Sequence, residues 1–284
     1  MKKGDIFILL WYNIIIYHNK ESAMENQKQI PAEWYYFIKL FAAVCMLIDH
    51  TRNVFGENWN EGIILVTVII GRLAFPLFAW ELVQCFHFTQ NRIKHFISLI
   101  ILALVSEVPF DMALERTYFT FSGQNVCFTL LFGWIGLFLL NSRFIKCEDE
   151  KKAKLLSCSL SIALCIPLFV IAALANFDYY WNGVLLVLLF EAAYRHKQRK
   201  KAEIIAVAAF IISLGAINGV IHIPCLLCVI LFRLAEGNSG FAEKLNRRIL
   251  LCKPVKLFLR YFYPLHLLIL GIIARFVFSS EFYG

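Results

Sequence analysis

The sequence predicts an all-α, polytopic membrane protein of about nine transmembrane helices, several of them kinked by proline. The first observation is composition: 60% of the 284 residues are hydrophobic and only 17% are charged, whereas soluble domains hold about 45–50% apolar and roughly 25% charged residues. The second is that the apolar residues fall in blocks near the length of about 20 residues that a helix needs to cross a bilayer. No polar segment as long as a soluble domain remains, so we expect one membrane domain.

Residues 1–30 stand apart from these blocks. They begin with Lys2 and Lys3 and contain an apolar stretch that is short for a span and lacks an obvious small-residue cleavage site. This segment is either an uncleaved signal-like sequence, or translation begins naturally at Met24. We expect a peripheral segment over residues 1–30 and a single transmembrane domain over residues 31–284.

Apolar blocks between polar breaks predict the individual spans in chain order. They are expected at residues 34–50, 62–86, 93–113, 125–142, 154–175, 179–194, 202–217, 219–235 and 257–278. The sixth to eighth blocks are short, which is compatible with tilted, tightly paired or partly re-entrant helices.

Charges in the connecting loops predict the orientation. Lys and Arg gather after the second, fourth, sixth and eighth spans, while the intervening loops hold mainly acids such as Glu57, Glu61 and Asp111. By the positive-inside rule this alternation places the N-terminus in the cytoplasm and the C-terminus outside, with His50 near the outer face. The same rule accounts for the net charge of +8, so no nucleic-acid partner is expected.

The nine cysteines show no disulfide pattern. Most lie inside apolar blocks, where Cys behaves as a small hydrophobic residue. Cys225 and Cys228 form a CxxC motif, but no second pair or neighbouring ligand accompanies it. We therefore expect no metal site.

Arg72 is the first ionisable residue that the membrane reading must explain. It lies about ten residues into the second span, roughly 15 Å deep, where a charge costs on the order of 2.5–3.5 kcal/mol. Pro76 cannot donate to the carbonyl of Arg72, so the helix is expected to kink there. Arg72 should face a cavity or polar network, or form a buried ion pair with Glu107 or Glu81.

Acids and histidines repeat this pattern in other spans. Glu107 and Asp111 are four residues apart and share a helical face, with Pro109 between them. His266 follows the kinking Pro264 near the middle of the last span. His266 also has a structural alternative, because a buried histidine is often only a core residue whose hydrogen bonds are satisfied.

Polar groups also gather at the ends of spans. Asp49 and Arg52 are three residues apart and could simply pair at a helix end. Asn125 and Thr129 lie near the outer start of the fourth span, where Asn125 is suited to be a helix N-cap. Glu81, near the inner end of the second span, is expected to pair with a loop lysine.

Several motifs in fixed order resemble the TraX family of bacterial membrane proteins, from about Lys39 to the C-terminus. They are "LIDH", "GRLAFPLFAWELV", "HFTQNR", "LVSEVPFD", "NVCFTLLFG", "FDYYWNGVLLVLLF" and "YPLHLLIL". The family's founding activity is N-acetylation of the pilin of a conjugative pilus from acetyl-CoA. The family is also similar to wider transmembrane acyltransferases, which pass an acyl group from cytosolic CoA to an acceptor across the membrane.

The resemblance implies a bacterial cytoplasmic membrane location, an acyltransferase activity and a set of site residues. Matched motif by motif, these residues are Asp49, His50, Arg72, Glu107, Asp111, Asn125, Thr129, Asp178, Tyr179 and His266. The sequence departs from the family pattern at residues 84–86, where a glycine is expected before Phe86. This departure puts in doubt how the acyl donor reaches the inner end of the second span.

The chemistry of acyl transfer assigns roles to these residues. His50 is the expected general base, because its ordinary pKa of about 6.5 lies near working pH. Asp49 is its neighbour but points about 100° away on a helix, so Glu107 or Asp111 is expected to orient the imidazole. Arg72 would hold the pantetheine arm or the thioester oxygen. Contacts to the phosphates of acetyl-CoA, or of another acyl-CoA, are expected from Arg92, Lys94, Arg143 and Lys146.

The expected acceptor is a peptide N-terminus, a glycan or a small molecule with an amine or hydroxyl. Two other functions compete with this hypothesis. A proton-coupled transporter would also use buried acids and broken helices, but such folds often contain internal repeats, and none is visible. A non-catalytic scaffold explains the hydrophobicity but gives no use to Arg72, Glu107 and Asp111.

Overall fold

The computed structural model describes residues 32–145, 149–236 and 252–278. Within these ranges helices are joined by turns and loops and no β-strand forms; Gln124 and Phe177 make only an isolated bridge. The all-α prediction is therefore confirmed for this part of the chain. The predictions for residues 1–30 and for Lys146 lie outside the described residues.

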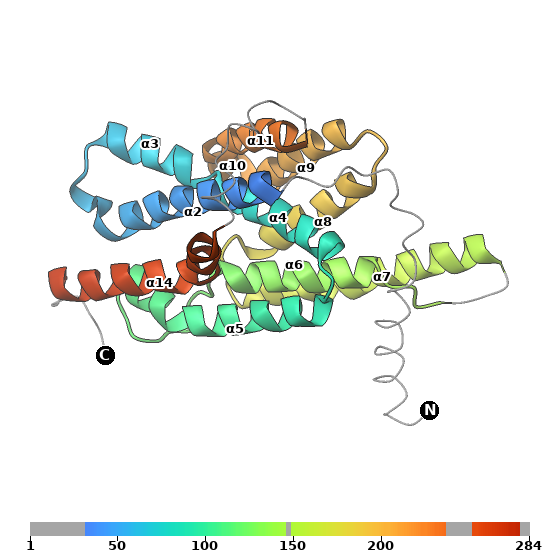
Figure 1. Ribbon diagram of the computed structural model, residues 1–284, viewed down its shortest axis with the longest axis horizontal. Coiled ribbons are helices and arrows are strands. Elements are labelled where there is room, and N and C mark those ends of the chain that lie inside the picture. Colours follow the sequence, from blue (N-terminus) through green and yellow to red (C-terminus); the bar gives the residue numbers. More distant parts are fainter. Residues whose placement is uncertain (1–31, 146–148, 237–251, 279–284) are drawn as a thin grey trace, which may run out of the picture.

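Every predicted span corresponds to one or more helices (Figure 1). In chain order they are α2 (Ala32–Phe55), η3 (Gly56–Asn58), α3 (Glu61–Gly71), α4 (Ala74–Phe88), α5 (Arg92–Phe110), η4 (Asp111–Glu115), α6 (Val126–Leu140), α7 (Glu150–Leu174), α8 (Tyr180–Arg195), α9 (Arg199–Ser213), α10 (Gly215–His222), η5 (Ile223–Leu226), α11 (Leu227–Glu236) and α14 (Lys253–Val277).

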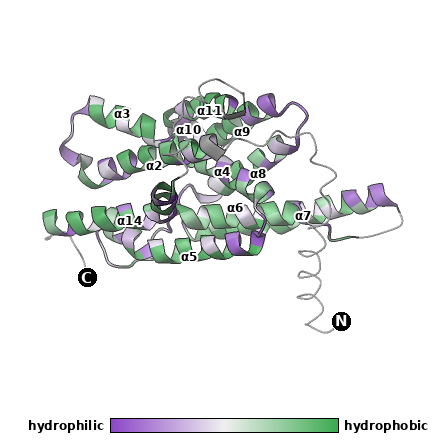
Figure 2. Ribbon diagram, in the orientation of Figure 1, coloured by the Kyte–Doolittle hydropathy of each residue, from purple (hydrophilic) through white to green (hydrophobic). Residues whose placement is uncertain are grey.

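The helices have the composition of membrane spans. Among the described residues, four helical stretches are long and apolar enough to cross a bilayer: Glu61–Phe88, Arg92–Glu115, Glu150–Leu174 and Lys253–Val277. Large apolar side chains such as Leu104, Ile162 and Leu265 are exposed on their surfaces, and apolar residues dominate most of the ribbon (Figure 2). Apolar side chains on an outer surface fit a lipid environment, so this is a membrane protein. Nine crossings remain a prediction.

Helix α4 forms the centre of the bundle. It packs against α2, α6 and α8, and most of its residues are buried. Trp80 and Phe86 of α4 are almost fully enclosed, and the Trp80 ring stacks on Phe232 of α11 with centroids 4.5 Å apart. This packing holds the beginning of α4, next to Arg72, inside the protein.

The join between α3 and α4 lies at Arg72 and Leu73; that Pro76 kinks the chain here stays a prediction. The Cys225 thiol donates to the carbonyl oxygen of Arg72 at 3.1 Å, so the acceptor that Pro76 leaves free is satisfied by η5. Cys228 donates to the carbonyl oxygen of Leu73 at 3.5 Å. The CxxC motif thus has a structural use that its sequence did not suggest.

Pro167 and Pro264 lie inside α7 and α14 without ending them, whereas α5 ends one residue after Pro109. α5 is followed by the π-helical turn η4, and such turns often occur at functional sites.

Candidate active site

Two histidines from opposite ends of the sequence meet inside the protein. His50 lies in the last third of α2 and His266 near the middle of α14, and both are buried. Their rings stack with centroids 5.0 Å apart, and Nδ1 of His50 is 2.8 Å from Nε2 of His266. The packing of α14 against α2 brings them together. The sequence predicted both residues but not their direct contact.

The hydrogen-bond network assigns the protons on this pair. Nδ1 of His266 lies 2.8 Å from the carbonyl oxygen of Phe262, which can only accept, so the proton of neutral His266 is on Nδ1. Nε2 of His266 is then an acceptor, and Nδ1 of His50 must donate to it. This leaves Nε2 of neutral His50 with a lone pair that no described residue uses. His50 keeps 8% of its surface exposed, and a free imidazole lone pair is what a general base needs.

Tyr263, one turn before His266 on α14, was not among the predicted site residues. Its ring centroid lies 6.4 Å from that of His50 and 5.7 Å from that of His266. Its hydroxyl is buried and makes no side-chain hydrogen bond in the described chain; the backbone amide of Val126 faces it, and it interacts electrostatically with Glu107 and Asp178. Tyr263 therefore connects the histidine pair with acids on other elements. The signal for it was the three-residue spacing to His266, which places both on one helical face.

Glu107 of α5 and Asn125 form one buried unit. The side-chain amide of Asn125 donates to Oε2 of Glu107 in a short hydrogen bond and to the carbonyl oxygen of Ala103 at 2.9 Å. Its Oδ1 accepts from the amide of Cys127 at 3.0 Å and caps α6, which confirms the N-cap expectation. Oε1 of Glu107 is buried and has no partner among the described residues.

Asp111 begins η4, four residues after Glu107. Its Oδ2 accepts from the amide of Thr120 at 2.8 Å, while its Oδ1 is buried without a partner in the described ranges. The expectation that Glu107 or Asp111 orients His50 is wrong for this structure. Nδ1 of His50, the nitrogen that an orienting acid would hold, is taken by His266.

Asp49 lies at the contact between α2 and α3 and serves a different partner from its neighbour His50. Its Oδ1 accepts from Arg52 at 2.7 Å, so the two residues pair at the helix end. The carboxylate also packs on Gly71, where a Cβ would lie only 2.3 Å from Oδ1 of Asp49. Arg72 interacts electrostatically with the same carboxylate.

Arg72 joins α3 to the segment that precedes α8. Besides Asp49, its guanidinium interacts electrostatically with Tyr179 and Asp178. The Tyr179 ring stacks on Phe75 with centroids 4.2 Å apart. The resemblance assigned Arg72, Asp178 and Tyr179 to one site, and the structure brings the three together.

Neither of the ion pairs considered for Arg72 is present in the described structure. Glu107 is held by Asn125, and Oε1 of Glu81 accepts from Lys39 at 2.9 Å and from the Tyr35 hydroxyl at 2.6 Å. The expectation that Glu81 pairs with a loop lysine is also wrong, because Lys39 lies within α2.

The segment before α8 is fixed in an unusual backbone conformation. Tyr179 and Tyr180 have φ angles of 64° and 47°. These values lie in the left-handed region, which residues other than glycine rarely adopt. Thr129 of α6 donates its hydroxyl hydrogen to the carbonyl oxygen of Asp178 at 2.5 Å, which holds the turn from the side. Strained backbone of this kind gathers at functional sites, and here it holds Tyr179 against Arg72.

Asp178 lies in the connection between α7 and α8, outside the membrane-spanning segments. Its side chain is half-buried. Burial raises the pKa of its carboxyl from 3.8 to about 6, and the attraction of Arg72 only partly opposes this. The ionised form of this carboxylate therefore destabilises the folded protein.

Replacing Asp178 by Asn is expected to stabilise the protein at neutral pH. The unfolded chain releases this proton near pH 3.9, but the folded chain keeps it up to about pH 6. Asp178 therefore lowers the free energy of unfolding progressively as pH rises from about 4 to 6. Above pH 6 this loss is constant, on the order of 2 kcal/mol. Thermal unfolding in detergent should give D178N a higher Tm than the wild type at pH 7.5 and an equal one at pH 4. A lower Tm at pH 7.5 would contradict this, and E150Q on exposed Glu150 is the control.

The residues predicted to bind CoA phosphates lie on two separate connections. Lys94 is exposed at the start of α5, and the Arg92 guanidinium covers the Phe86 ring at 4.4 Å. Arg143, after α6, lies 3.8 Å from Glu150 of α7. Their role in binding stays a prediction. Within the described ranges no three His, Cys, Asp or Glu side chains gather closely enough to hold a metal ion.

Comparison with known proteins places the chain in a family. The family model described as TraX protein matches residues 36–274 of the 284 residues. The matched region contains both histidines, Arg72 and the acids described above. No curated protein and no solved structure gives a significant match. Because the family match covers well over half of the sequence, this chain belongs to the TraX family.

Proposed function

We propose that this protein is an integral-membrane acyltransferase. It would move an acyl group, acetyl in the simplest case, from cytosolic acyl-CoA to an amine or hydroxyl on the extracytoplasmic side. The observation that supports this best is the hydrogen bond from His50 to His266, which leaves Nε2 of His50 as a free acceptor inside the bundle. The expected orientation of α2 puts this nitrogen near the outer face, within reach of an external acceptor.

The proposed reaction is a proton-coupled exchange at a thioester. Nε2 of His50 takes a proton from the acceptor while the acceptor's nitrogen or oxygen attacks the thioester carbonyl. The carbon–sulfur bond then breaks, and the CoA sulfur takes the proton from the His50 imidazolium. His50 returns to its neutral form, and His266 keeps its ring orientation through both steps. The same lone pair would also serve a route through a covalent acyl-histidine.

Donors near the histidine pair are suited to stabilise the oxyanion. The Tyr263 hydroxyl is buried, and the backbone amide of Val126 that faces it can only donate, so the hydrogen of the hydroxyl is available. Arg72, which interacts electrostatically with Asp178, adds a positive charge to the same bundle. We assign Asn125 and Thr129 positioning roles, because Asn125 holds Glu107 and Thr129 holds the Asp178 carbonyl.

The test uses purified full-length protein reconstituted in vesicles, with radiolabelled acetyl-CoA and a cell-envelope extract as the source of acceptors. The proposal predicts release of free CoA thiol in step with transfer of label to the extract, and dependence on both components. A proton flux driven by a solute of the extract, without thiol release, would identify a transporter. If neither thiol release nor proton flux were observed, the protein would lack the proposed activity.

Replacing Tyr263 by Phe is expected to slow transfer by about 10²–10³-fold, the usual effect of losing an oxyanion donor. Stability should fall little, because the hydroxyl that is removed makes no side-chain hydrogen bond among the described residues and only the backbone amide of Val126 faces it. The vesicle assay measures the rate. The matched control is Y261F on the same helix, since Tyr261 is 53% exposed. Equal rates for Y263F and Y261F would remove Tyr263 from the reaction.

A further inference from the structure

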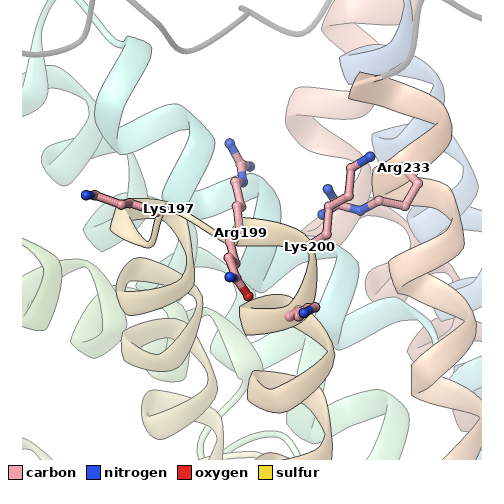
Figure 3. Close-up of a pocket in the computed structure, with 6 residues that line it drawn as sticks. Lys197, Arg199, Lys200 and Arg233 are labelled. Carbon is pink, nitrogen blue, oxygen red and sulfur yellow. The ribbon is translucent and has the colours of Figure 1, made fainter.

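A basic pocket lies where α8 turns into α9, apart from the histidine pair. It has a volume of about 410 Å³ and is closed on one side by α11 (Figure 3). The residues that line it are Lys197, Gln198, Arg199, Lys200, Lys201 and Arg233. All of them are cationic except Gln198, so the described part of the lining contains no carboxylate.

A buried acid fixes two of these cations in place. Glu203 is 1% exposed and accepts from Nε of Arg199 at 2.9 Å. Arg233, which comes from α11, pairs with the same carboxylate, and Trp80 of α4 donates to it at 3.3 Å. Glu203 thus holds the arginines of two helices in one arrangement. Glu203 pairs with the two arginines and leaves the side chains of Lys197, Lys200 and Lys201 at the same pocket, so its described lining is strongly positive and attracts anions.

The backbone of the turn adds to this field. α9 begins at Arg199, and its N-cap residue Gln198 makes no side-chain hydrogen bond to the first turn. The first amide groups of a helix have no partner within the helix, and the positive end of the helix dipole favours phosphate groups. Helix terminus, lysines and fixed arginines therefore all favour the same kind of ligand.

We infer that this pocket binds a phosphate-bearing anion. Its volume is in the range of small-molecule sites, about 300–1,000 Å³, and exceeds what one phosphate needs. Two sources carry such groups at the cytoplasmic side, where the charge pattern puts this turn: the CoA part of an acyl donor and the headgroup of an anionic phospholipid. A headgroup could be followed by its chains along the exposed apolar side chains of Ile204 and Leu234. The phosphate site does not depend on the proposed function, but its CoA source does.

The experiment compares two triple lysine variants of the full-length protein in detergent. In the pocket variant Lys197, Lys200 and Lys201 become Gln, which leaves the arginine pairs with Glu203 unchanged. In the control variant Lys151, Lys152 and Lys154 become Gln, three exposed lysines of another basic turn. Titration calorimetry measures binding of CoA and its competition by inorganic pyrophosphate. Native mass spectrometry measures retention of phosphatidylglycerol against phosphatidylcholine.

The pocket variant should bind at least one of the two ligands at least tenfold more weakly than the wild type, while the control binds as the wild type does. Loss confined to CoA identifies the nucleotide source, and loss confined to phosphatidylglycerol the lipid source. Wild-type binding of both by the pocket variant would overturn the inference, even if acyl transfer were shown. CoA bound at the pocket without any acyl transfer would overturn the proposed function and leave the site standing.

Discussion

Acyl transfer by the His50→Gln variant should be about 10²–10⁴-fold slower than by the wild type, the usual contribution of a general base. Glutamine fills similar space and can still donate to Nε2 of His266, but it has no basic lone pair to take the acceptor's proton. The fold should persist, because His50 is joined to its surroundings by one described side-chain hydrogen bond. Thiol release and label transfer in vesicles measure the rate, and detergent elution profiles report folding.

The control for this variant is His95→Gln. His95 also lies in a helix and is half-buried, but it belongs to the first turn of α5, beside Lys39 and Glu81 rather than the histidine pair. H95Q should transfer at the wild-type rate. If H50Q and H95Q were equally active, His50 would have no part in the reaction.

Replacing Gly71 by Ala is expected to have the largest effect on stability, a loss of about 2–3 kcal/mol. The new Cβ would lie 2.3 Å from Oδ1 and 2.5 Å from Cβ and Cγ of Asp49. The Asp49 Cβ is fixed to the α2 backbone, so α2 and α3 would have to move apart and weaken the Asp49–Arg52 pair. Thermal unfolding in detergent should show a clear fall in Tm.

Gly123 provides the comparison for this prediction. A Cβ there would meet only the carbonyl oxygen of Asn176, at an ordinary 3.7 Å. G123A should unfold at nearly the wild-type temperature. A Tm for G71A equal to that of G123A would show that α2 and α3 do not approach as closely as described.

Hydropathy was enough to predict the helices, because each span must be apolar over its own length whatever its neighbours are. It could not predict how the spans are divided. The eighth predicted span is three elements, α10, η5 and α11; η5 begins with Pro224 in its first turn and packs on the Arg72 carbonyl. The number of crossings also depends on depth and tilt, which hydropathy does not contain.

The site was predicted residue by residue but not as an arrangement. His50 and His266 are 216 positions apart, and nothing local in either motif indicates that their rings meet. An acid was expected to orient His50 because carboxylates are its usual partners, yet a second imidazole takes that position. The pocket at Lys197–Lys201 was missed because the positive-inside rule already accounts for an excess of Lys and Arg in alternate loops of a membrane protein. Charge alone did not distinguish it from the turns with Arg92 or Arg143.

The most direct test of this account is the transfer rate of H50Q, H266Q and the double variant in the same vesicle assay. If His266 acts by holding the proton and ring of His50, H266Q should be intermediate and should shift the pH at which the rate is half-maximal. The double variant should then be no slower than H50Q alone. Independent losses that multiply in the double variant, or an H50Q rate equal to that of the wild type, would contradict the account.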